Sequence, residues 1–472
     1  MTSGSCDVGL IGLGVMGGGL ARNLASRGYR VAIYSRSRET ALRLQATHPE
    51  AGFTAVSDLG DLVRSLSRPR RVFLLVPAGA GVDDLLSALN PFLEQDDVVV
   101  DAGNSHYQDT ERRCAEASAR PWRFLGMGVS GGADGALRGP SLMPGGDVRG
   151  WPQVERVCEA IAAASDRGPC VAWCGRGGAG HFVKMVHNGI EYADMQLLAE
   201  SALLLRRGLG LEPAALAEIF EAWNGAELES FLVETAARIH RVEDPGVPGA
   251  SLVDAVLDRA GQKGTGRWTV EAALALGVAA PVVAAAVDAR LLSADPGARS
   301  GVRARLGQAP AGKVEGVSVD DVRSAFYASR IVAYAEGFTL LGAAVREHAY
   351  GTSLAEVARI WRAGCIIRAR VLDAILVALS MDLGWLVLAE PLRAEVAQRV
   401  PAWRRIVSAA VRGALPVPAM SASLAWLDTI RTSPGSAALI QALRDSFGAH
   451  GYERRDRPGE LVHSAWLPTL DS

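Results

Sequence analysis

The chain of 472 residues is 49% hydrophobic and 21% charged, which is an ordinary globular composition with room for two or three domains. Its net charge of -2 creates no global positive field, so we expect neither nucleic acid nor an anionic membrane among its partners. The six cysteines are scattered without zinc spacing, so we expect no metal site, free thiols and a cytoplasmic location.

The first third of the chain alternates short apolar runs with amphipathic stretches. Residues 8–13, 31–34, 72–76 and 98–101 are typical of buried strands, and residues 16–27 and 82–89 of the helices between them. No basic segment precedes the first apolar run, so the sequence predicts no signal peptide. The alternation predicts a parallel, doubly wound α/β sheet of the Rossmann type.

The first predicted strand leads into a glycine motif that opens a helix, namely Gly12, Leu13, Gly14, Val15, Met16 and Gly17. The first glycine permits a tight turn, the second lets a pyrophosphate approach the backbone, and the third lets helix and strand pack closely. Because the motif lies between a strand and a helix, it predicts a dinucleotide site rather than a purely structural turn.

The second predicted strand ends at Ser35, Arg36 and Ser37, where an NAD-binding fold usually places an acidic residue for the ribose 2′-hydroxyl. An arginine at this place can pair with a 2′-phosphate. The sequence therefore favours NADP over NAD. The alternative interpretation is that Arg36 is an ordinary solvated arginine.

Two polar loops follow later predicted strands. Asn104 comes just after residues 98–101, at the carboxyl edge where ligands of such sheets bind, so it can reach both cofactor and substrate. Ser130, Gly131 and Gly132 offer a hydroxyl and exposed amides that suit a carboxylate or hydroxyl ligand. Taken alone, either segment is equally consistent with a plain turn.

Long helical patterns replace the alternation after residues 175–180, where three glycines indicate a flexible joint and a domain boundary. Helices are predicted at residues 194–207, 213–222, 228–241, 251–260, 319–342, 354–360 and 368–379. The apolar segment 272–287 is too short to span a bilayer and is expected to be a buried helix broken at Pro281. The segment from about Gly448 is charged and is expected to be a tail.

The stretch HFVKMVHNGIEY at residues 181–192 is the most informative part of the chain. Read as a helix it is mostly apolar, yet Lys184, His187, Asn188 and Glu191 fall at i, i+3, i+4 and i+7 and so share one face. Because unpaired buried charges are costly, this face is predicted to line a cavity for a polar ligand. A lysine and a carboxylate two turns apart can serve as base and acid for one substrate.

Further candidate anion ligands lie in the helical half. The segment 261–268, GQKGTGRW, offers amides, the ammonium of Lys263 and the hydroxyl of Thr265, although it lacks the order of a P-loop. Arg290 lies in a helical pattern, and Arg444 and His450 flank a glycine near the end of the chain. Each of these alone would usually be a surface or structural residue.

Together these segments resemble the 6-phosphogluconate dehydrogenase family from end to end. The matching stretches are IGLGVMG, DAGNSHYQDTERR, GVSGG, GPSLMPGG, GAGHFVKMVHNGIEY, WNGAELESFL, LVDAVLDRAGQKGTGRWT, FYASRIVAYAEGF, IWRAGCIIR and RDSFGAHGYERRD. The resemblance implies an NADP-binding Rossmann-like domain at residues 1–178 and an all-helical substrate and dimerisation domain at residues 179–440. It also implies a homodimer in which the tail at residues 441–472 reaches the partner's active site.

The resemblance further implies the substrate and the roles of the candidate residues. The substrate would be 6-phospho-D-gluconate, which the pentose phosphate pathway converts to D-ribulose 5-phosphate and carbon dioxide with formation of NADPH. Lys184 matches the general base at the carbon-3 hydroxyl, and Glu191 matches the acid that protonates carbon 1, with no metal required. The matching substrate ligands are Asn104, Ser130, Gly131, Gly132, His187, Asn188, Tyr192, Lys263, Thr265, Arg290, Arg444 and His450. The matching cofactor contacts are Gly12–Gly17, Ser35–Ser37, Val76, Pro77, Ala78 and Asn104.

The chain departs from the family pattern next to the site. Pro77 replaces a frequent lysine, Ala102 and His106 change the segment around Asn104, and Leu137 stands where an arginine is usual. Residues 371–392 also match poorly. These changes leave open a specialised paralogue, a β-hydroxyacid dehydrogenase that acts on a related phosphorylated sugar acid. A non-catalytic NADPH-binding protein is a third hypothesis, which the retention of both Lys184 and Glu191 disfavours.

Overall fold

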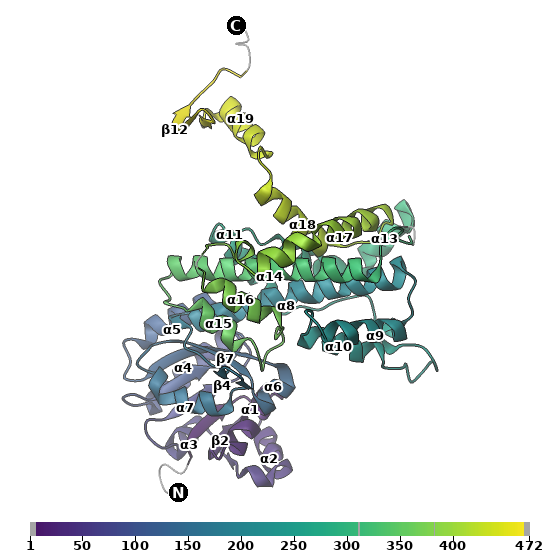
Figure 1. Cartoon of the computed structure of the whole chain (residues 1–472). Coiled ribbons are helices and arrows are strands. Elements are labelled where there is room, and N and C mark those ends of the chain that lie inside the picture. Colours follow the sequence, from purple (N-terminus) through teal and green to yellow (C-terminus); the bar gives the residue numbers. More distant parts are fainter. Residues whose placement is uncertain (1–5, 310–311, 382, 467–472) are drawn as a thin grey trace. The chain divides into compact units, whose positions relative to one another are not determined.

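The computed structural model describes residues 6–309, 312–381 and 383–466. The chain divides into two compact units, Met1–Ser423 and Leu424–Ser472, and each is described here by itself. The larger unit combines one extended sheet, flanked by helices, with a layer of long helices (Figure 1). No helix in the described part of the chain is long and apolar enough to cross a membrane.

Eight strands form one sheet in the order β10-β7-β6-β5-β4-β1-β2-β3. Their bounds are β1 (Val8–Ile11), β2 (Val31–Tyr34), β3 (Thr54–Ala55), β4 (Arg71–Leu74), β5 (Val98–Asp101), β6 (Arg123–Ser130), β7 (Ser141–Gly146) and β10 (Gly175–Arg176). Neighbours from β3 to β6 are parallel, β7 is antiparallel to β6, and β10 joins β7 in parallel. The predicted Rossmann-type α/β fold is confirmed. The chain order changes direction between β1 and β4, which is where such folds bind ligands.

Helices cover both faces of this sheet. They are α1 (Val15–Ser26), α2 (Arg38–Thr47), α3 (Leu59–Ser65), α4 (Ala80–Leu89), α5 (Tyr107–Ala117), α6 (Gly132–Arg138) and α7 (Trp151–Ile161). Alternate residues of a strand enter different cores, since Val98 and Val100 join the cluster with α1 and α7 while Val99 joins the cluster with α3 and α4. A strand buried on both faces needs a continuous apolar run, and such runs allowed these strands to be predicted from the sequence.

Long helices make up the rest of the larger unit. Their bounds are α8 (Ala179–Leu203), α9 (Pro213–Asn224), α10 (Phe231–His240), α11 (Thr265–Ala275), α12 (Pro281–Ser293), α13 (Pro296–Leu306), α14 (Val319–Glu347), α15 (Leu354–Ile360), α16 (Val371–Leu379), α17 (Leu392–Arg412) and α18 (Pro418–Arg431), which continues into the second unit. Helices α8 and α14 run side by side (Figure 1). The break at Pro281 is confirmed, because α12 begins at that proline.

Some shorter elements complete the chain. They are the single turns Pro49–Ala51, Asn90–Phe92, Leu252–Ala255 and Leu386–Leu388, the π-helical turn Leu204–Gly208, the hairpin of β8 (Ala164–Ser165) and β9 (Gly168–Pro169), and in the second unit α19 (Ala437–Gly448), β11 (Tyr452–Arg454) and β12 (Arg457–Val462). The predicted helix at residues 251–260 is wrong, since only one short turn forms there. Its apolar side chains Val256 and Leu257 are exposed, so no buried face stabilises a helix.

The glycines at residues 175–180 lie in a tightly packed segment. A β-carbon on Gly180 would come within 2.3 Å of the Gly126 carbonyl oxygen and within 2.4 Å of that of Met143. Gly175 belongs to β10 and is equally crowded by the Tyr350 backbone. Close backbone approach, and not flexibility, accounts for these glycines.

Candidate active site

Helix α8 carries the polar face that the spacing predicted, and the face is buried. Lys184, His187 and Asn188 have 7%, 0% and 9% of their surface exposed, and Glu191 is half-buried. Lys184 Nζ lies 3.4 Å from His187 Nδ1, and Glu191 Oε2 lies 3.7 Å from the same nitrogen. One imidazole therefore bridges the candidate base and the candidate acid.

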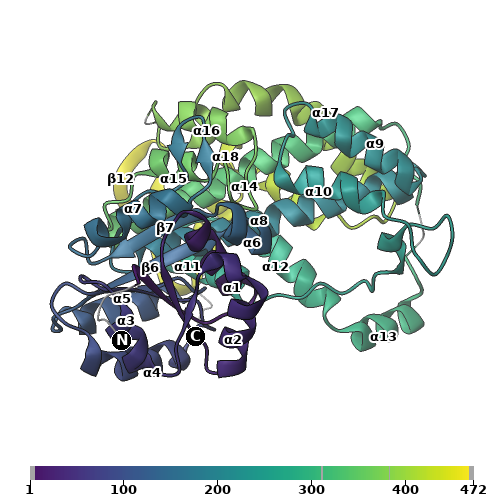
Figure 2. The same ribbon diagram turned by 90° about the horizontal axis from the view of Figure 1, so that it is seen from below.

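The position of α8 depends on glycines in β6. The helix packs against β6 and β7, beside which Figure 2 shows it, and a β-carbon on Gly128 would come within 2.3 Å of Lys184 Cβ. Because Gly126 and Gly128 lack side chains, the helix backbone can approach the strand backbone closely. This contact places Lys184 against Gly128, which is two residues before Ser130, the last residue of β6.

His187 connects the helix face to that strand end. Its Nε2 lies 3.0 Å from Ser130 Oγ, and its Nδ1 lies 3.1 Å from Asn188 Oδ1. Burial and the nearby Lys184 charge hold the pKa of His187 well below its usual range, so the ring is neutral. A neutral imidazole has one donor and one acceptor nitrogen, so it can accept a hydrogen bond from Lys184 or donate one to Asn188.

Burial shifts Lys184 and Glu191 toward their neutral forms. Desolvation lowers the pKa of Lys184 below its usual 10.5, although the carboxylate of Glu191 opposes the shift. Desolvation also raises the pKa of Glu191 above 4.5, against the opposing charges of Lys184 and Arg290. A less basic lysine and a more basic carboxylate are the properties that proton transfer near neutral pH requires.

The lysine at this position is unusual for this chain. Only three of its 49 lysines and arginines are lysines, namely Lys184, Lys263 and Lys313. Arginine forms nearly all of the ion pairs, and it cannot lose its proton at any ordinary pH. Two of the three lysines are candidate site residues, which fits a site that needs an amine rather than a permanent cation.

A second group of candidates meets near the middle of the same helix. The guanidinium of Arg290, from α12, lies 3.5 Å above the centre of the Tyr192 ring. Gly266 in the first turn of α11 is tight against that ring, where a β-carbon would come within 2.4 Å of Tyr192. Thr265 is buried beside it. The structure therefore brings together Glu191, Tyr192, Thr265 and Arg290, as the resemblance implied.

Lys263 and Asn104 are candidates that lie exposed in loops of the larger unit. Lys263 lies in the loop before α11 and has no hydrogen bond or ion pair with any described residue. Asn104 lies in the loop between β5 and α5. This unpaired ammonium lies two residues before Thr265, in a loop whose Gly261 carbonyl oxygen accepts from Arg290 Nη1 at 3.4 Å, and it is available to an anionic ligand.

The segment after α15 contributes residues that the sequence did not single out. Trp361 packs edge-on against His187 with ring centres 5.6 Å apart, and the buried Cys365 lies close enough to Lys184 to affect its pKa. Gly131 is held against the Gly364 carbonyl oxygen, and Gly132 faces Ile366. These contacts join distant parts of the chain, so no local spacing could have revealed them.

The loops at the carboxyl edge of the sheet fit a dinucleotide. Gly12 has φ +96°, and the first turn of α1 has no side-chain cap and no acidic residue, so its free N–H groups can bind phosphate. Nothing crowds the space at Gly14, and Val15 is 76% exposed. Arg36, at the end of β2, is exposed and pairs with none of the described side chains, which suits a 2′-phosphate.

The second unit holds Arg444 and His450 in a short helix and turn. Both are exposed, and Arg444 Nη1 donates to Gln441 Oε1 at 3.1 Å. Between them Asp445 is fully buried and accepts hydrogen bonds from the Gly451 and Ser464 amides, His463 Nδ1 and Trp466 Nε1. These bonds hold the end of α19 against the β11–β12 hairpin, so the unit has its own internal order.

The cysteines and possible metal ligands add no further site. All six cysteines are free thiols, and burial raises the pKa of Cys158 and Cys174 far above the ordinary value. Within the described ranges, no three His, Cys, Asp or Glu side chains gather as a metal site would require.

Comparison with known proteins covers nearly the whole chain. Residues 7–175 match the family described as the NAD binding domain of 6-phosphogluconate dehydrogenase, and residues 180–466 match the 6-phosphogluconate dehydrogenase C-terminal domain. The decarboxylating 6-phosphogluconate dehydrogenase 2 of Oryza sativa chloroplasts is 48% identical over 97% of this chain and 93% of its own length. The decarboxylating 6-phosphogluconate dehydrogenase of Synechococcus elongatus is 46% identical, with coverage of 97% and 99%.

A solved structure agrees with these relatives. Plasmodium falciparum 6-phosphogluconate dehydrogenase, studied in its apo form and in complexes with its cofactor NADP+ and its substrate 6-phosphogluconate, superposes with a TM-score of 0.93. It is 36% identical to this chain, and the match covers 98% of this chain and all of the other.

Proposed function

Because the chain belongs to the 6-phosphogluconate dehydrogenase family, we propose that it catalyses the decarboxylating oxidation of 6-phospho-D-gluconate by NADP+. The products are D-ribulose 5-phosphate, carbon dioxide and NADPH. The observation that carries this proposal is the buried His187, which lies 3.4 Å from Lys184 Nζ and 3.7 Å from Glu191 Oε2, because it joins an amine of lowered pKa and a carboxyl group of raised pKa on one helix face.

Lys184 is the proposed general base. Its lowered pKa increases the fraction of neutral amine, which takes the proton from the carbon-3 hydroxyl. Bound NADP+ supplies the hydride acceptor for carbon 3. Once protonated, Lys184 donates a hydrogen bond to the 3-keto oxygen and stabilises the negative charge that develops there as the carboxylate leaves as carbon dioxide. Because His187 beside it is neutral, the imidazole adds no positive charge that would oppose protonation of Lys184.

Glu191 is the proposed acid. Its raised pKa keeps a proton available for carbon 1 of the enediol after carbon dioxide has left. Arg290 is close enough to lower that pKa, so ligand phosphate at Arg290 would weaken this opposing charge and favour protonated Glu191. The two groups therefore act in order, with Lys184 first and Glu191 last.

The remaining candidates bind the two ends of the ligands. The residues proposed for the sugar acid are Asn104, Ser130, Gly131, Gly132, His187, Asn188 and Tyr192, and those proposed for the phosphate end are Lys263, Thr265 and Arg290. The glycine motif, Ser35–Ser37, Val76–Ala78 and Asn104 are proposed for NADP, with Arg36 on the 2′-phosphate. Support comes from the uncapped first turn of α1 and from the unpaired cations Arg36 and Lys263.

We also propose the homodimer and the division into residues 1–178, 179–440 and 441–472. Helix α19 supports a partner for the tail, because Leu439, Ile440, Leu443 and Phe447 are each more than half exposed. In this arrangement Arg444 and His450 act on the partner's substrate. Mixing Lys184→Ala with Arg444→Ala protein tests it, because each heterodimer then has one site with both residues intact. About a quarter of wild-type activity is expected after random exchange of subunits, and no recovery would contradict action across the dimer.

Absorbance of NADPH tests the reaction itself. Purified protein with NADP+ and 6-phosphogluconate should form NADPH and release carbon dioxide in equal amounts. Turnover with another phosphorylated sugar acid alone would support the specialised paralogue. Tight NADP+ binding without turnover of any such acid would support a non-catalytic protein.

A further inference from the structure

The two loops that contain proposed cofactor contacts follow neighbouring strands of the sheet and pack closely against each other. The loop between β4 and α4 contains Val76, Pro77 and Ala78, and the loop between β5 and α5 contains Asn104. A β-carbon on Gly103 would come within 2.9 Å of the Val76 carbonyl oxygen. The relative position of these two loops therefore sets the shape of the proposed cofactor site.

The side chain of Arg113 reaches both loops from α5. It is fully buried, and its Nη2 donates to the Gly79 carbonyl oxygen at 3.0 Å, at the end of the first loop. Its Nη1 lies 3.4 Å from Ser105 Oγ and 3.5 Å from Asp101 Oδ2, at the two ends of the second loop. One guanidinium thus spans the gap between the loops.

The carboxylates on either side of Arg113 complete the connection. Asp83, in the first half of α4, accepts a bidentate pair from Arg113 at 2.8 and 2.9 Å, and these bonds hold the pKa of Asp83 at about 2. Asp101 is fully buried and accepts from the Gly103 amide at 3.0 Å and from Ser105 Oγ at 2.6 Å. Arg113 therefore holds α4 and its loop on one side and the loop before Asn104 on the other.

We propose that Arg113 is a positioning residue for the cofactor, which fixes the β4–α4 loop against the β5–α5 loop through Gly79, Asp101 and Ser105. The proposal rests on the proposed NADP site in these loops. Arg113 touches neither reacting group, so it acts through the backbone that carries Val76–Ala78 and Asn104. Its planar fork is essential, because a lysine offers a single charge point and cannot hold both loops at once.

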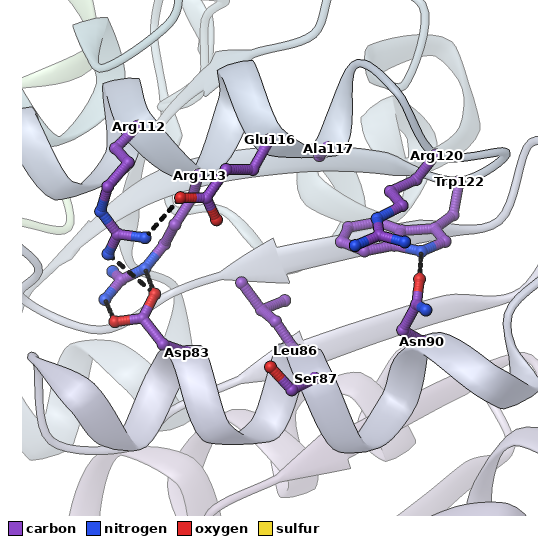
Figure 3. Close-up of a pocket in the computed structure, with 10 residues that line it drawn as sticks. All are labelled: Asp83, Leu86, Ser87, Asn90, Arg112, Arg113, Glu116, Ala117, Arg120 and Trp122. Carbon is purple, nitrogen blue, oxygen red and sulfur yellow. Dashed lines mark hydrogen bonds and ion pairs between the residues drawn. The ribbon is translucent and has the colours of Figure 1, made fainter.

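Arg112 provides a matched control on the same helix. It borders a cavity of about 240 Å³ between α4 and α5 and donates to Asp83 and Glu116 (Figure 3). Its side chain is 45% exposed and forms no hydrogen bond or ion pair with the described residues of either loop. The two arginines share one carboxylate, so their comparison separates the loop contacts from the ion pair itself.

Isothermal titration of wild type, Arg113→Lys, Ser105→Ala and Arg112→Met with NADP+ and with 6-phosphogluconate tests the proposal. Arg113→Lys should weaken NADP+ binding at least about tenfold, the usual scale of one lost hydrogen bond to a charged group, because the two loops are then no longer held together. Ser105→Ala, a smaller change, should weaken NADP+ binding in the same direction. The dissociation constant for 6-phosphogluconate should change less than that for NADP+ in both variants, because Asn104 is the one proposed substrate ligand in these two loops. Arg112→Met should match wild type for both ligands.

Three outcomes would overturn the proposal. Unchanged NADP+ affinity in Arg113→Lys and Ser105→Ala would show that the loops keep their places without these bonds. Equal weakening of both ligands would show a general structural role. An equal loss of NADP+ affinity in Arg112→Met would assign the effect to the Asp83 ion pair. A failure of the proposed NADP site looks different, because wild-type protein itself would then not bind NADP+.

Discussion

Gly128 of β6 lies against Lys184 of α8 so closely that any β-carbon at position 128 would come within 2.3 Å of Lys184 Cβ. Gly128→Ala should therefore push α8 away from the strand and misplace Lys184. We expect a loss of about 1–3 kcal/mol in the free energy of unfolding, as for other overpacked cores, and a kcat at least about tenfold lower.

Gly135→Ala is the control for this change. A β-carbon there meets its nearest neighbour at 3.5 Å, which is an ordinary contact, so stability and kcat should remain near wild type. Thermal melts and steady-state rates of both variants are the measurements. Full activity in Gly128→Ala would show that α8 can shift without cost to the reaction.

Lys184→Arg tests whether the site needs an amine that can lose its proton. The variant keeps a positive charge but has no accessible neutral form, so it cannot act as a base. We expect kcat to fall at least about 100-fold while 6-phosphogluconate still binds. Lys313→Arg, the same exchange at the lysine outside the proposed site, should leave kcat unchanged. A similar kcat in all three proteins would remove Lys184 from the role of base.

The dependence of activity on pH should reflect the ionisation of both Lys184 and Glu191. Activity should rise with pH as Lys184 loses its proton, at a pH below 10.5 because burial lowers its pKa. Loss of the proton on Glu191, which carbon 1 requires, should lower activity as the pH rises through the raised pKa of that carboxyl group. Glu191→Gln should lower kcat and remove this dependence on pH, since its amide does not titrate. An unchanged pH profile in Glu191→Gln would assign both limbs to other groups.

Arg36→Ala should change the choice of cofactor. Because Arg36 is an unpaired cation at the end of β2, its loss should raise KM for NADP+ by about tenfold or more, the usual scale of a charge-assisted hydrogen bond. KM for NAD+ should change little. Arg43→Ala, at another exposed arginine in α2, is the control and should leave both values alone. Equal increases for NAD+ and NADP+ would contradict a 2′-phosphate contact.

Glu336 should make stability depend on pH. It lies in the interior of α14 and accepts hydrogen bonds from the Val282 and Val283 amides, the first turn of α12, and burial raises its pKa to about 8. The folded state then holds a proton that the unfolded state releases near 4.5, so the free energy of unfolding should decline between about pH 5 and 8. The largest possible decline in the free energy of unfolding is about 1.4 kcal/mol for each pKa unit between the folded and unfolded values of Glu336.

Urea unfolding of Glu336→Gln across this range is the measurement. The variant should show a smaller decline than wild type, and Glu347→Gln, at the exposed end of the same helix, should reproduce the wild-type slope. A decline that is unchanged in Glu336→Gln would place the titrating group elsewhere.

Local sequence patterns were sufficient to predict much of the fold and part of the candidate site. The face of Lys184, His187, Asn188 and Glu191 follows from helical spacing alone, and the buried strands follow from their apolar runs. The glycines of β6 interrupt such a run, so that strand was missed, although they are what lets α8 approach. The contacts of Gly128 with Lys184 and of Arg113 with Gly79 join distant segments, and no single-sequence pattern specifies such pairs.

The scarcity of lysine makes the protonation state of Lys184 directly observable. Lysine labelled with nitrogen-15 and carbon-13 would introduce only three labelled side chains into the whole chain. Two of them, Lys263 and Lys313, lie outside the buried face of α8. The Lys184 amine can therefore be followed by nuclear magnetic resonance during a pH titration, with and without ligands, so that its charge is read apart from the rate of the reaction.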